Sequence, residues 1–256
     1  MTEPQISNAY ASLPIPDVLP KHIAIIMDGN NRYAKAHGMA KGQGHVAGKE
    51  SLDPLVEYCV AIGIEVLTVF AFSSENWQRP VDEVALLMRL LSATINEQLP
   101  RMHKYNMCLR FIGDRSQLTP ELQQQMADAE AQTANHKAMT LVIAISYGGQ
   151  WDIANAAQQL AKKIQQGKMS VDQLTVETLG EQVQLADVAA VDMLIRTGGE
   201  YRISNFLLWQ SAYAELFFTD TLWPDFDAKE LNEMMFEFSR RQRRFGKTSE
   251  QVEGQA

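Results

Sequence analysis

Cysteine is scarce in this sequence, and long hydrophobic runs are absent. Cys59 and Cys108 lie in apolar patterns without CxxC spacing, which excludes a disulfide framework and a cysteine-based metal site. Buried free thiols in a reducing cytoplasm are therefore expected. The most apolar stretches, such as "VLTVFAF" from Val66 to Phe72, have strand length and are too short to span a membrane. The N-terminus carries Glu3 and no apolar core, so it is not a signal peptide.

Positive charge is also in short supply. The 23 Lys and Arg residues are outnumbered by 31 Asp and Glu residues, and the formal net charge is −8. This balance argues against non-specific binding of nucleic acid, which needs a broad basic face. Any phosphate site must therefore be local. Several familiar motifs are missing too: there is no Walker A loop, no HExxH, no GxSxG and no Asp-Asp-x-x-Asp metal box.

The order of the predicted elements indicates one α/β domain. Residues 1–20 contain four prolines and little periodicity, and we predict a loose N-terminal arm there. Apolar, β-rich segments follow at 23–27, 66–72, 107–112, 141–146 and 193–195, with helical patterns between them. This alternation predicts a single domain over 21–246 with a central, mostly parallel sheet flanked by helices. Residues 247–256 are predicted to form a flexible tail.

Three helices carry clear end signals. "TPELQQQMADAEAQTA" places Thr119 as the N-cap and Pro120 at the first helical position. "WDIANAAQQLAKKIQQG" has one apolar face and stops at Gly167. "DAKELNEMMFEFSRRQRRFG" begins with a capping-box pattern of Asp227 and Glu230.

Two further helical patterns are less simple. "GHVAGKESLDPLVEYCVAIG" has helical spacing with Pro54 in the middle, so either one helix kinks there or a second helix starts at Asp53 and Pro54. The segment from Val84 to Leu91 is apolar around more than half of its circumference. Such a helix is usually buried on several sides, although it could instead form the wall of an apolar cavity.

Polar and cationic residues follow three of the predicted strands. "DGNNR" comes after Met27, "SSENWQRP" after Phe72 and "RTGGEYRIS" after Ile195, and each of them contains arginine. Ligands of open parallel sheets bind beyond the carboxyl ends of the strands. The three segments are therefore expected to meet at one site.

The first of these segments suits an anion. Gly29 permits positive φ, and a tight turn entering a helix presents free backbone N–H groups, to which Arg32 and Lys41 could add charge. Asp28 would repel an anion unless a cation bridges the two, and Mg²⁺ commonly takes one or two carboxylates together with substrate phosphates. A plain helix N-cap is the alternative role for Asp28.

The third segment and the residues that follow it contain further candidate ligands of phosphate or metal. Arg196, Arg202 and Ser204 suit a second diphosphate, because guanidinium groups bind phosphate oxygens bidentately, although a solvated surface turn would look the same. Glu215 lies among apolar residues in "WQSAYAELFF". A buried carboxylate there needs a partner, either an arginine or a metal ion.

Taken together, six stretches resemble the cis-prenyltransferases over about residues 22–246: "HIAIIMDGNNRYAKAHG", "GHVAGK", "AFSSENWQRP", "YGGQWDI", "IRTGGEYRISNFLLWQSAYAELFFTD" and "WPDF". The resemblance implies an elongated α/β fold with an apolar tunnel, a Mg²⁺ cofactor and a homodimer. It implies an enzyme that adds isopentenyl diphosphate units to farnesyl diphosphate, with each new double bond cis. The expected product is undecaprenyl diphosphate, a precursor of the lipid carrier of bacterial cell-wall synthesis. The protein is expected to be cytoplasmic, without a membrane span, and to deliver its product at the inner face of the membrane.

The resemblance also implies roles for individual residues. Asp28 is expected to be the catalytic carboxylate and, with Glu215, a Mg²⁺ ligand, and Asn76 is implicated in proton removal. Isopentenyl diphosphate is expected at Arg196, Arg202, Ile203 and Ser204. Segment 73–79 is expected to be flexible over the active site, and segment 240–246 to reach the partner subunit. The residues expected around the allylic diphosphate are Gly29, Asn30, Asn31, Arg32, Tyr33, Lys41, His45, Ser73, Ser74, Glu75, Trp77 and Arg79.

Three positions depart from the family pattern. Asn31 replaces a usual glycine, Tyr33 a usual tryptophan, and Lys41 a usual arginine. Asn tolerates left-handed backbone better than other non-glycine residues, and Lys41 keeps its charge but loses the guanidinium fork.

The tunnel wall is expected to combine the helix at 84–91 with one face of the strand at 141–145, and the choice of face stays open. Shorter products, a phosphate-ester hydrolase and a non-catalytic polyprenyl-binding subunit are the alternative functions.

Overall fold

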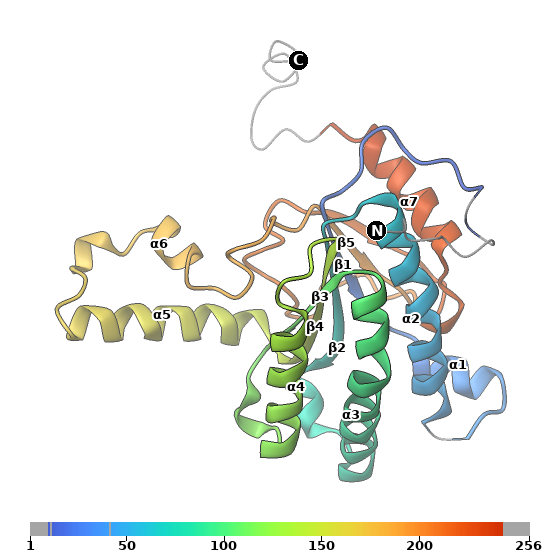
Figure 1. Cartoon of the computed structure of the whole chain (residues 1–256), viewed down its shortest axis with the longest axis horizontal. Coiled ribbons are helices and arrows are strands. Elements are labelled where there is room, and N and C mark those ends of the chain that lie inside the picture. The colour runs from blue at the N-terminus through green and yellow to red at the C-terminus, as the bar shows by residue number, and fades with distance from the viewer. Residues whose placement is uncertain (1–9, 11, 41, 243–256) are drawn as a thin grey trace.

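The computed structural model describes residue 10, residues 12–40 and residues 42–242. In this part of the chain, six parallel strands form one sheet in the order β3-β4-β2-β1-β5-β6 (Figure 1). The five predicted strands are confirmed, with ends that differ by at most two residues. β6 was not predicted, because it has only four residues and begins with a charged one. The strands are β1 (His22–Ile26), β2 (Val66–Ser73), β3 (Met107–Ile112), β4 (Met139–Tyr147), β5 (Met193–Arg196) and β6 (Glu215–Phe218).

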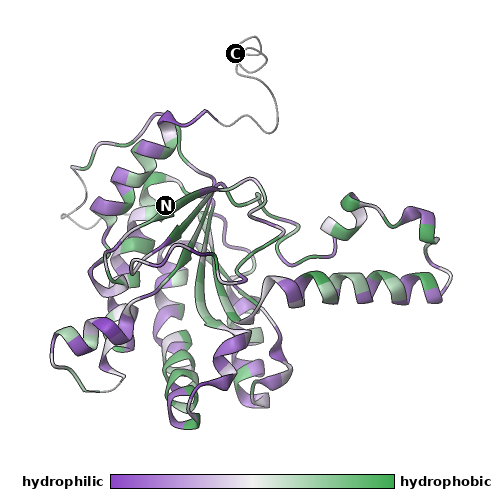
Figure 2. Cartoon of the chain, turned by 180° about the vertical axis from the view of Figure 1, so that it is seen from behind, coloured by the Kyte–Doolittle hydropathy of each residue, from purple (hydrophilic) through white to green (hydrophobic). Residues whose placement is uncertain are grey.

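Both faces of the sheet are buried, as a parallel sheet requires. Side chains alternate along each strand, so Ile23 and Ile25 belong to one apolar cluster and Ala24 and Ile26 to the other. The first cluster is completed by α2 (Gln43–Ile62), α3 (Val81–Lys104), α4 (Pro120–Thr133) and α7 (Ala228–Arg240). Irregular chain around Phe206 completes the second cluster. The strands are correspondingly hydrophobic in Figure 2.

The helix ends follow the predicted signals with one exception. The Thr119 side chain accepts the Leu122 N–H, and Pro120 is the first residue of α4. Asp227 caps α7 by accepting the Lys229 and Glu230 N–H groups. The Glu230 carboxylate does not close a capping box, because it accepts the Thr219 hydroxyl at 2.6 Å instead.

α2 runs through Pro54 as one continuous helix. A second helix starting at Asp53 is therefore wrong. The Asp53 carboxylate reaches across to α3, where it accepts from Gln98 at 2.9 Å and lies 2.6 Å from Arg101 Nη1.

α5 (Gly149–Gln165) and α6 (Val176–Gly180) project from the body of the molecule (Figures 1 and 2). α5 ends before Gly167, whose φ is 67°, as the sequence predicted. Three apolar side chains near α6 are exposed: Val171, Leu174 and Val176. This arm therefore presents apolar surface away from the core.

Residues 12–20 lie on the body, where a loose arm was predicted. Leu13 and Leu19 pack against the first apolar cluster, and the Pro14 carbonyl accepts from the Asn232 side chain at 3.0 Å. The predicted tail at 247–256 lies outside the described residues. Among the helices that the structure describes, none combines the length and the hydrophobicity that crossing a bilayer requires.

Candidate active site

The chain connections create a switch point between β1 and β5. β1 leads to β2 on one side, whereas β4 leads back to β5 on the other side of β1. Ligands of open parallel sheets bind at such a reversal, beyond the carboxyl ends of the strands. The register pairs Ile26 with Arg196, so Asp28 and Arg196 meet at this edge.

Asp28 lies between two arginines. Arg196 Nη2 donates to Asp28 Oδ2 at 2.9 Å, and Arg32 Nη2 lies 3.3 Å from Oδ1. Burial of Asp28 favours its protonated form, but the hydrogen bond and charge of Arg196, followed by the charge of Arg32, outweigh burial and lower the pKa of Asp28. At neutral pH Asp28 is therefore an ionised carboxylate at the switch point.

Asp28 is not a helix cap. α1 (Asn30–Ala36) has Gly29 as its N-cap, with φ 115° and no side-chain cap hydrogen bond. Only glycine suits this position, since a Cβ would also come within 3.0 Å of the Leu222 backbone. Asn31 lies inside α1 and is not among the residues with positive φ, so its replacement of the usual glycine causes no backbone strain.

Arg196 also organises the third predicted segment. Its Nη1 donates to the Arg202 carbonyl at 2.7 Å and to Ser204 Oγ at 2.6 Å, while the residue is only 5% exposed. The Arg202 side chain is exposed and pairs with Glu200. The structure thus brings Arg196, Arg202 and Ser204 together, with Ile203 packed behind them on the second apolar cluster.

The second predicted segment forms the capped 3-10 helix η1 (Ser74–Gln78) directly after β2. Ser73 N donates to Asn76 Oδ1 at 3.0 Å, and Trp77 Nε1 donates to Ser146 Oγ at 2.9 Å. Arg79 pairs with Glu83 at 3.1 Å. These bonds hold η1 against the carboxyl ends of β2 and β4, next to β1 in the sheet.

One polar pocket of about 1660 Å³ joins the three segments. Five predicted residues that the structure describes lie outside its lining: Tyr33, Ser74, Trp77, Ile203 and Glu215. The Tyr33 ring lies against the His37 ring instead, with 4.1 Å between the ring centroids. Lys41 lies outside the described residues. Two polar lining residues, Glu200 and Asn205, were not predicted. The predicted residues that line the pocket are Asp28, Gly29, Asn30, Asn31, Arg32, His45, Ser73, Glu75, Asn76, Arg79, Arg196, Arg202 and Ser204.

Glu215 does not join this site. It starts β6 and is level with Met193 and thus with Ile23, whereas Asp28 follows Ile26, which lies about 10 Å further along the strand direction on a strand two places away. The two carboxylates therefore start from different positions along the sheet, and Glu215 is not among the residues that line the polar pocket. Arg241 Nη1 donates to Glu215 Oε2 at 2.9 Å, so this carboxylate has an arginine partner within the chain.

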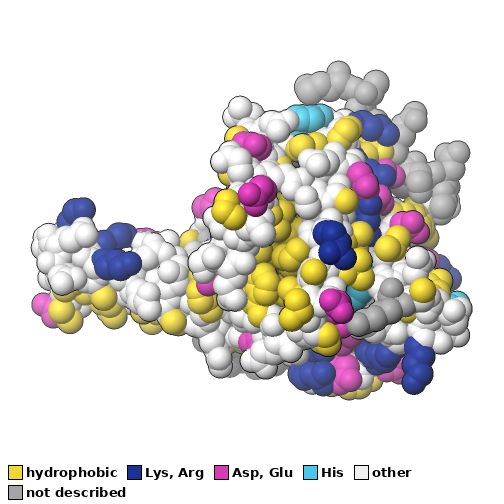
Figure 3. All heavy atoms as spheres, turned by 90° about the horizontal axis from the view of Figure 1, so that it is seen from below, with side chains coloured by type: hydrophobic (Ala, Val, Ile, Leu, Met, Phe, Trp, Pro, Cys, Tyr) yellow, Lys and Arg dark blue, Asp and Glu magenta, His cyan; other side chains and the backbone are white. Residues whose placement is uncertain are grey.

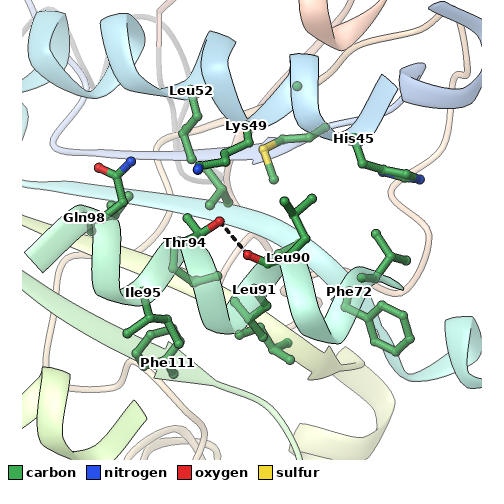
Figure 4. A pocket seen from close by; sticks show the side chains of 18 of the residues that line it. His45, Lys49, Leu52, Phe72, Leu90, Leu91, Thr94, Ile95, Gln98 and Phe111 are labelled. Carbon is green, nitrogen blue, oxygen red and sulfur yellow. Dashed lines mark hydrogen bonds between the residues drawn. The ribbon is translucent and has the colours of Figure 1, made fainter. Parts of the chain in front are cut away.

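An apolar cavity adjoins the polar pocket. Figure 4 shows Leu52 of α2 and Leu90 of α3 pointing toward each other, with Leu91 on the other side of α3 in this view, beside Ile95. Met88 of the predicted wall helix lines it together with Ala71 of β2, and β4 contributes the face that carries Ile143 and Ile145. Figure 3, which views the molecule from below, shows hydrophobic side chains gathered at the centre of the lower surface of the molecule. The two spaces share the lining residues Met27, Asn30, His45, Ala71 and Leu87.

His45 stands where the polar pocket meets the apolar cavity. Burial, followed by the charge of Arg79, lowers the pKa of His45, so the ring is neutral at pH 7. Its Nε2 is buried without a hydrogen-bond partner among the described residues. It is therefore free to contact a ligand.

The acidic side chains fit a metal ion that arrives with a substrate. Among the described residues, no group of three or more His, Cys, Asp or Glu side chains is placed to hold an ion. Mg²⁺ usually keeps several waters and binds through one or two carboxylates plus substrate phosphates. The ionised Asp28, whose side chain is 31% exposed, suits that mode.

Comparisons with known proteins agree with this arrangement. A family model described as "Putative undecaprenyl diphosphate synthase" matches residues 26–246. The chain is 59% identical over 92% of its length, and over 94% of the relative, to the farnesyl-diphosphate-specific ditrans,polycis-undecaprenyl-diphosphate synthase of Acinetobacter baylyi. It is 48% identical to the synthase of the same name in Escherichia coli, over 93% of this chain and 96% of that one. The crystal structure of lavandulyl diphosphate synthase from Lavandula x intermedia matches with a TM-score of 0.86 and 32% identity, over 90% of this chain and 99% of that chain.

Proposed function

Because the chain belongs to the undecaprenyl diphosphate synthase family, we propose that it condenses successive isopentenyl diphosphate units onto farnesyl diphosphate. The expected product is undecaprenyl diphosphate, in which each new double bond is cis. The observation that carries the proposal is the Asp28–Arg196 pair, which lies in a polar pocket that opens directly into an apolar cavity. A diphosphate head and a hydrocarbon tail need these two adjoining environments.

Two diphosphates repel each other, so each needs cationic partners. For isopentenyl diphosphate we propose Arg196, Arg202 and Ser204, with Ile203 supporting their loop. Guanidinium groups match phosphate oxygens bidentately, and the Ser204 hydroxyl adds a donor. For the allylic diphosphate we propose the turn 29–32 with its backbone N–H groups, together with Tyr33, Lys41, His45, Ser73, Ser74, Glu75, Trp77 and Arg79.

Asp28 is the proposed catalytic carboxylate. Arg196 and Arg32 keep it ionised and hold both of its oxygens at the switch point. We propose Mg²⁺ at Asp28, and Glu215 of the same chain, which lies outside the polar pocket and is paired with Arg241, is not part of this proposal. When bound, Mg²⁺ would neutralise charge on the leaving diphosphate.

The growing chain is proposed to occupy the apolar cavity. Each methylene removed from water contributes about 0.8 kcal/mol, so every added unit favours a wall of apolar side chains. Asn76 is proposed to take part in removal of the proton from the isopentenyl unit. An amide is not a base at neutral pH, so Asn76 would act by orienting the acceptor, and Ser73 N already fixes its Oδ1.

We also propose a homodimer that works in the cytoplasm and passes its product to the inner face of the membrane. The projecting arm exposes Val171, Leu174 and Val176, and the edge strand β6 exposes Leu216. Exposed apolar patches can mark protein–protein interfaces, so we propose that the partner subunit covers these side chains. Sedimentation of the wild type should give twice the mass of one chain, and Leu174→Glu with Val176→Glu should shift it toward the monomer.

One assay tests the proposed reaction. The protein is incubated with farnesyl diphosphate, labelled isopentenyl diphosphate and Mg²⁺, and the lipid products are sized, with Asp28→Asn as the control. Labelled long-chain polyprenyl diphosphate is expected from the wild type. Release of inorganic phosphate without incorporation would indicate a hydrolase, and binding without turnover would indicate a carrier subunit.

A further inference from the structure

Asn205 joins three segments at the rim of the polar pocket. Its Nδ2 donates to Glu75 Oε1 on η1 at 2.9 Å. Its Oδ1 accepts the Gln150 N–H at 2.9 Å, and its carbonyl accepts the Gly149 N–H at 2.6 Å, both at the start of α5. One side chain therefore links η1 to the base of the projecting arm.

Asn205 directly follows the proposed isopentenyl diphosphate loop. Arg196 holds that loop through the Arg202 carbonyl and Ser204 Oγ. Ser204 and Asn205 have φ values of 46° and 61°, a left-handed conformation that non-glycine residues keep only where their surroundings enforce it. A diphosphate that takes over the Ser204 contact would therefore move Asn205 through a single peptide bond.

The junction with η1 is tightly packed. A Cβ on Gly148 would lie 2.5 Å from Ser74 Oγ and 2.7 Å from Asn205 Nδ2, so no side chain fits between them. Glu75 lines the pocket beside Asn205, where its carboxylate would face bound diphosphates. An amide donor on that carboxylate offsets the repulsion and fixes where η1 lies.

Building on the proposed function, we propose that Asn205 is a positioning residue that couples isopentenyl diphosphate binding to the placement of η1. η1 carries Asn76 in its first turn, so the coupling would bring that amide into place only when the second substrate is present. Asn205 acts through Glu75 and need not touch the reacting atoms.

If Asn205 had a purely structural role, that role would rest on its other contacts, in which it accepts the N–H groups of Gly149 and Gln150 at the start of α5. The two roles separate because Asn205→Asp keeps an acceptor for the Gln150 N–H but turns the Glu75 contact into a pair of carboxylates. The double variant Asn205→Asp with Glu75→Gln restores a hydrogen bond of reversed direction. Its net charge equals that of the wild type, which controls for simple repulsion of substrate.

The test measures amide hydrogen exchange in segment 73–79 with and without isopentenyl diphosphate, alongside KM and kcat. We expect isopentenyl diphosphate to slow exchange in the wild type, Asn205→Asp to abolish that protection and lower kcat at least tenfold, and the double variant to recover most of both. Glu75→Ala, which leaves the α5 contacts intact, should also abolish the protection.

The proposal is overturned if Asn205→Asp keeps the ligand-dependent protection, or if the double variant recovers nothing while its melting temperature matches the wild type. Failure of the proposed function is a separate result. A wild type that elongates no farnesyl diphosphate would refute the reaction, whereas the exchange measurement needs only binding of isopentenyl diphosphate.

Discussion

Arg196 donates to both Asp28 and Ser204 through the two terminal nitrogens of its guanidinium group. Nη2 lies 2.9 Å from Asp28 Oδ2, and Nη1 lies 2.6 Å from Ser204 Oγ. The side chain is 6% exposed, so solvent screens these bonds little. The carboxylate that follows β1 and the loop after β5 are thereby held by a single buried cation, which lies between the two proposed diphosphate sites.

Replacing Arg196 by lysine should break at least one of its two hydrogen bonds, to Asp28 or to Ser204. A single ammonium group cannot span both partners, and a hydrogen bond to a charged group contributes about 1.5–3 kcal/mol. We expect kcat/KM for isopentenyl diphosphate to fall roughly ten- to hundredfold, as measured in the labelled incorporation assay. Arg202→Lys, whose side chain is exposed, should cost less. An Arg196→Lys enzyme with wild-type kcat/KM would show that the fork is not needed.

Removing the Asp28 carboxylate should abolish turnover without unfolding the chain. Asp28→Ala is expected to lower kcat by roughly a thousandfold or more, the scale of losing a key charge-stabilising group. Some stability is lost as well, because buried Arg196 loses its counter-charge. Circular dichroism and the melting temperature check the fold, and near-normal turnover would refute the proposed role.

Asp28 also shows how far the sequence could lead. The strand, the turn and the three polar strand ends were predictable from apolar runs and glycine, which are local signals. The choice between cap and site residue depended on Arg196, which is 168 positions away and becomes a neighbour only through the β1–β5 pairing. The partner of Glu215 could not be predicted for the same reason, because Arg241 follows α7 and meets Glu215 of β6 only in the folded chain.

Other features left no local signal at all. β6 is a four-residue strand whose place at the sheet edge depends on β5. The cavity-facing side of β4 could not be read from alternation, since both faces of the strand are apolar and only helix packing distinguishes them. Asn205 looked like an ordinary loop residue, and its importance lies in contacts with η1 and α5.

Acid should weaken the fold through His22. The ring is fully buried, with Nδ1 2.7 Å from the Ala189 carbonyl and Nε2 2.7 Å from Thr68 Oγ1. The carbonyl can only accept, so Nδ1 carries the proton and Nε2 accepts the hydroxyl of Thr68, as in a neutral imidazole. Burial lowers the pKa of His22 below 6.5, against smaller opposing effects of Ala189 and Asp192.

The sign of the pH effect follows from proton binding. Between the lowered pKa and 6.5 the unfolded chain binds more protons than the folded one, so stability falls as pH drops below 6.5. The loss is limited to about 1.4 kcal/mol for each unit by which the pKa is lowered. Denaturant titrations from about pH 8 to about pH 5 measure it. The double variant His22→Phe with Thr68→Val should lack this component, so an unchanged difference from the wild type across that range would refute it.

A bulky side chain in the apolar cavity should shorten the product. Ala71 on β2 and Met88 on α3 both line the cavity, and Ala71 also borders the polar pocket. Tryptophan at either position removes space that the growing chain would occupy, so elongation should stop earlier, with Ala71→Trp giving the shortest lipids because it lies nearest the diphosphates. Arg89→Trp is the matched control, since Arg89 is the next residue on α3 but is exposed. Chromatography of the labelled lipids should give wild-type lengths for that control. Unchanged lengths for both cavity variants would mean that the chain grows elsewhere.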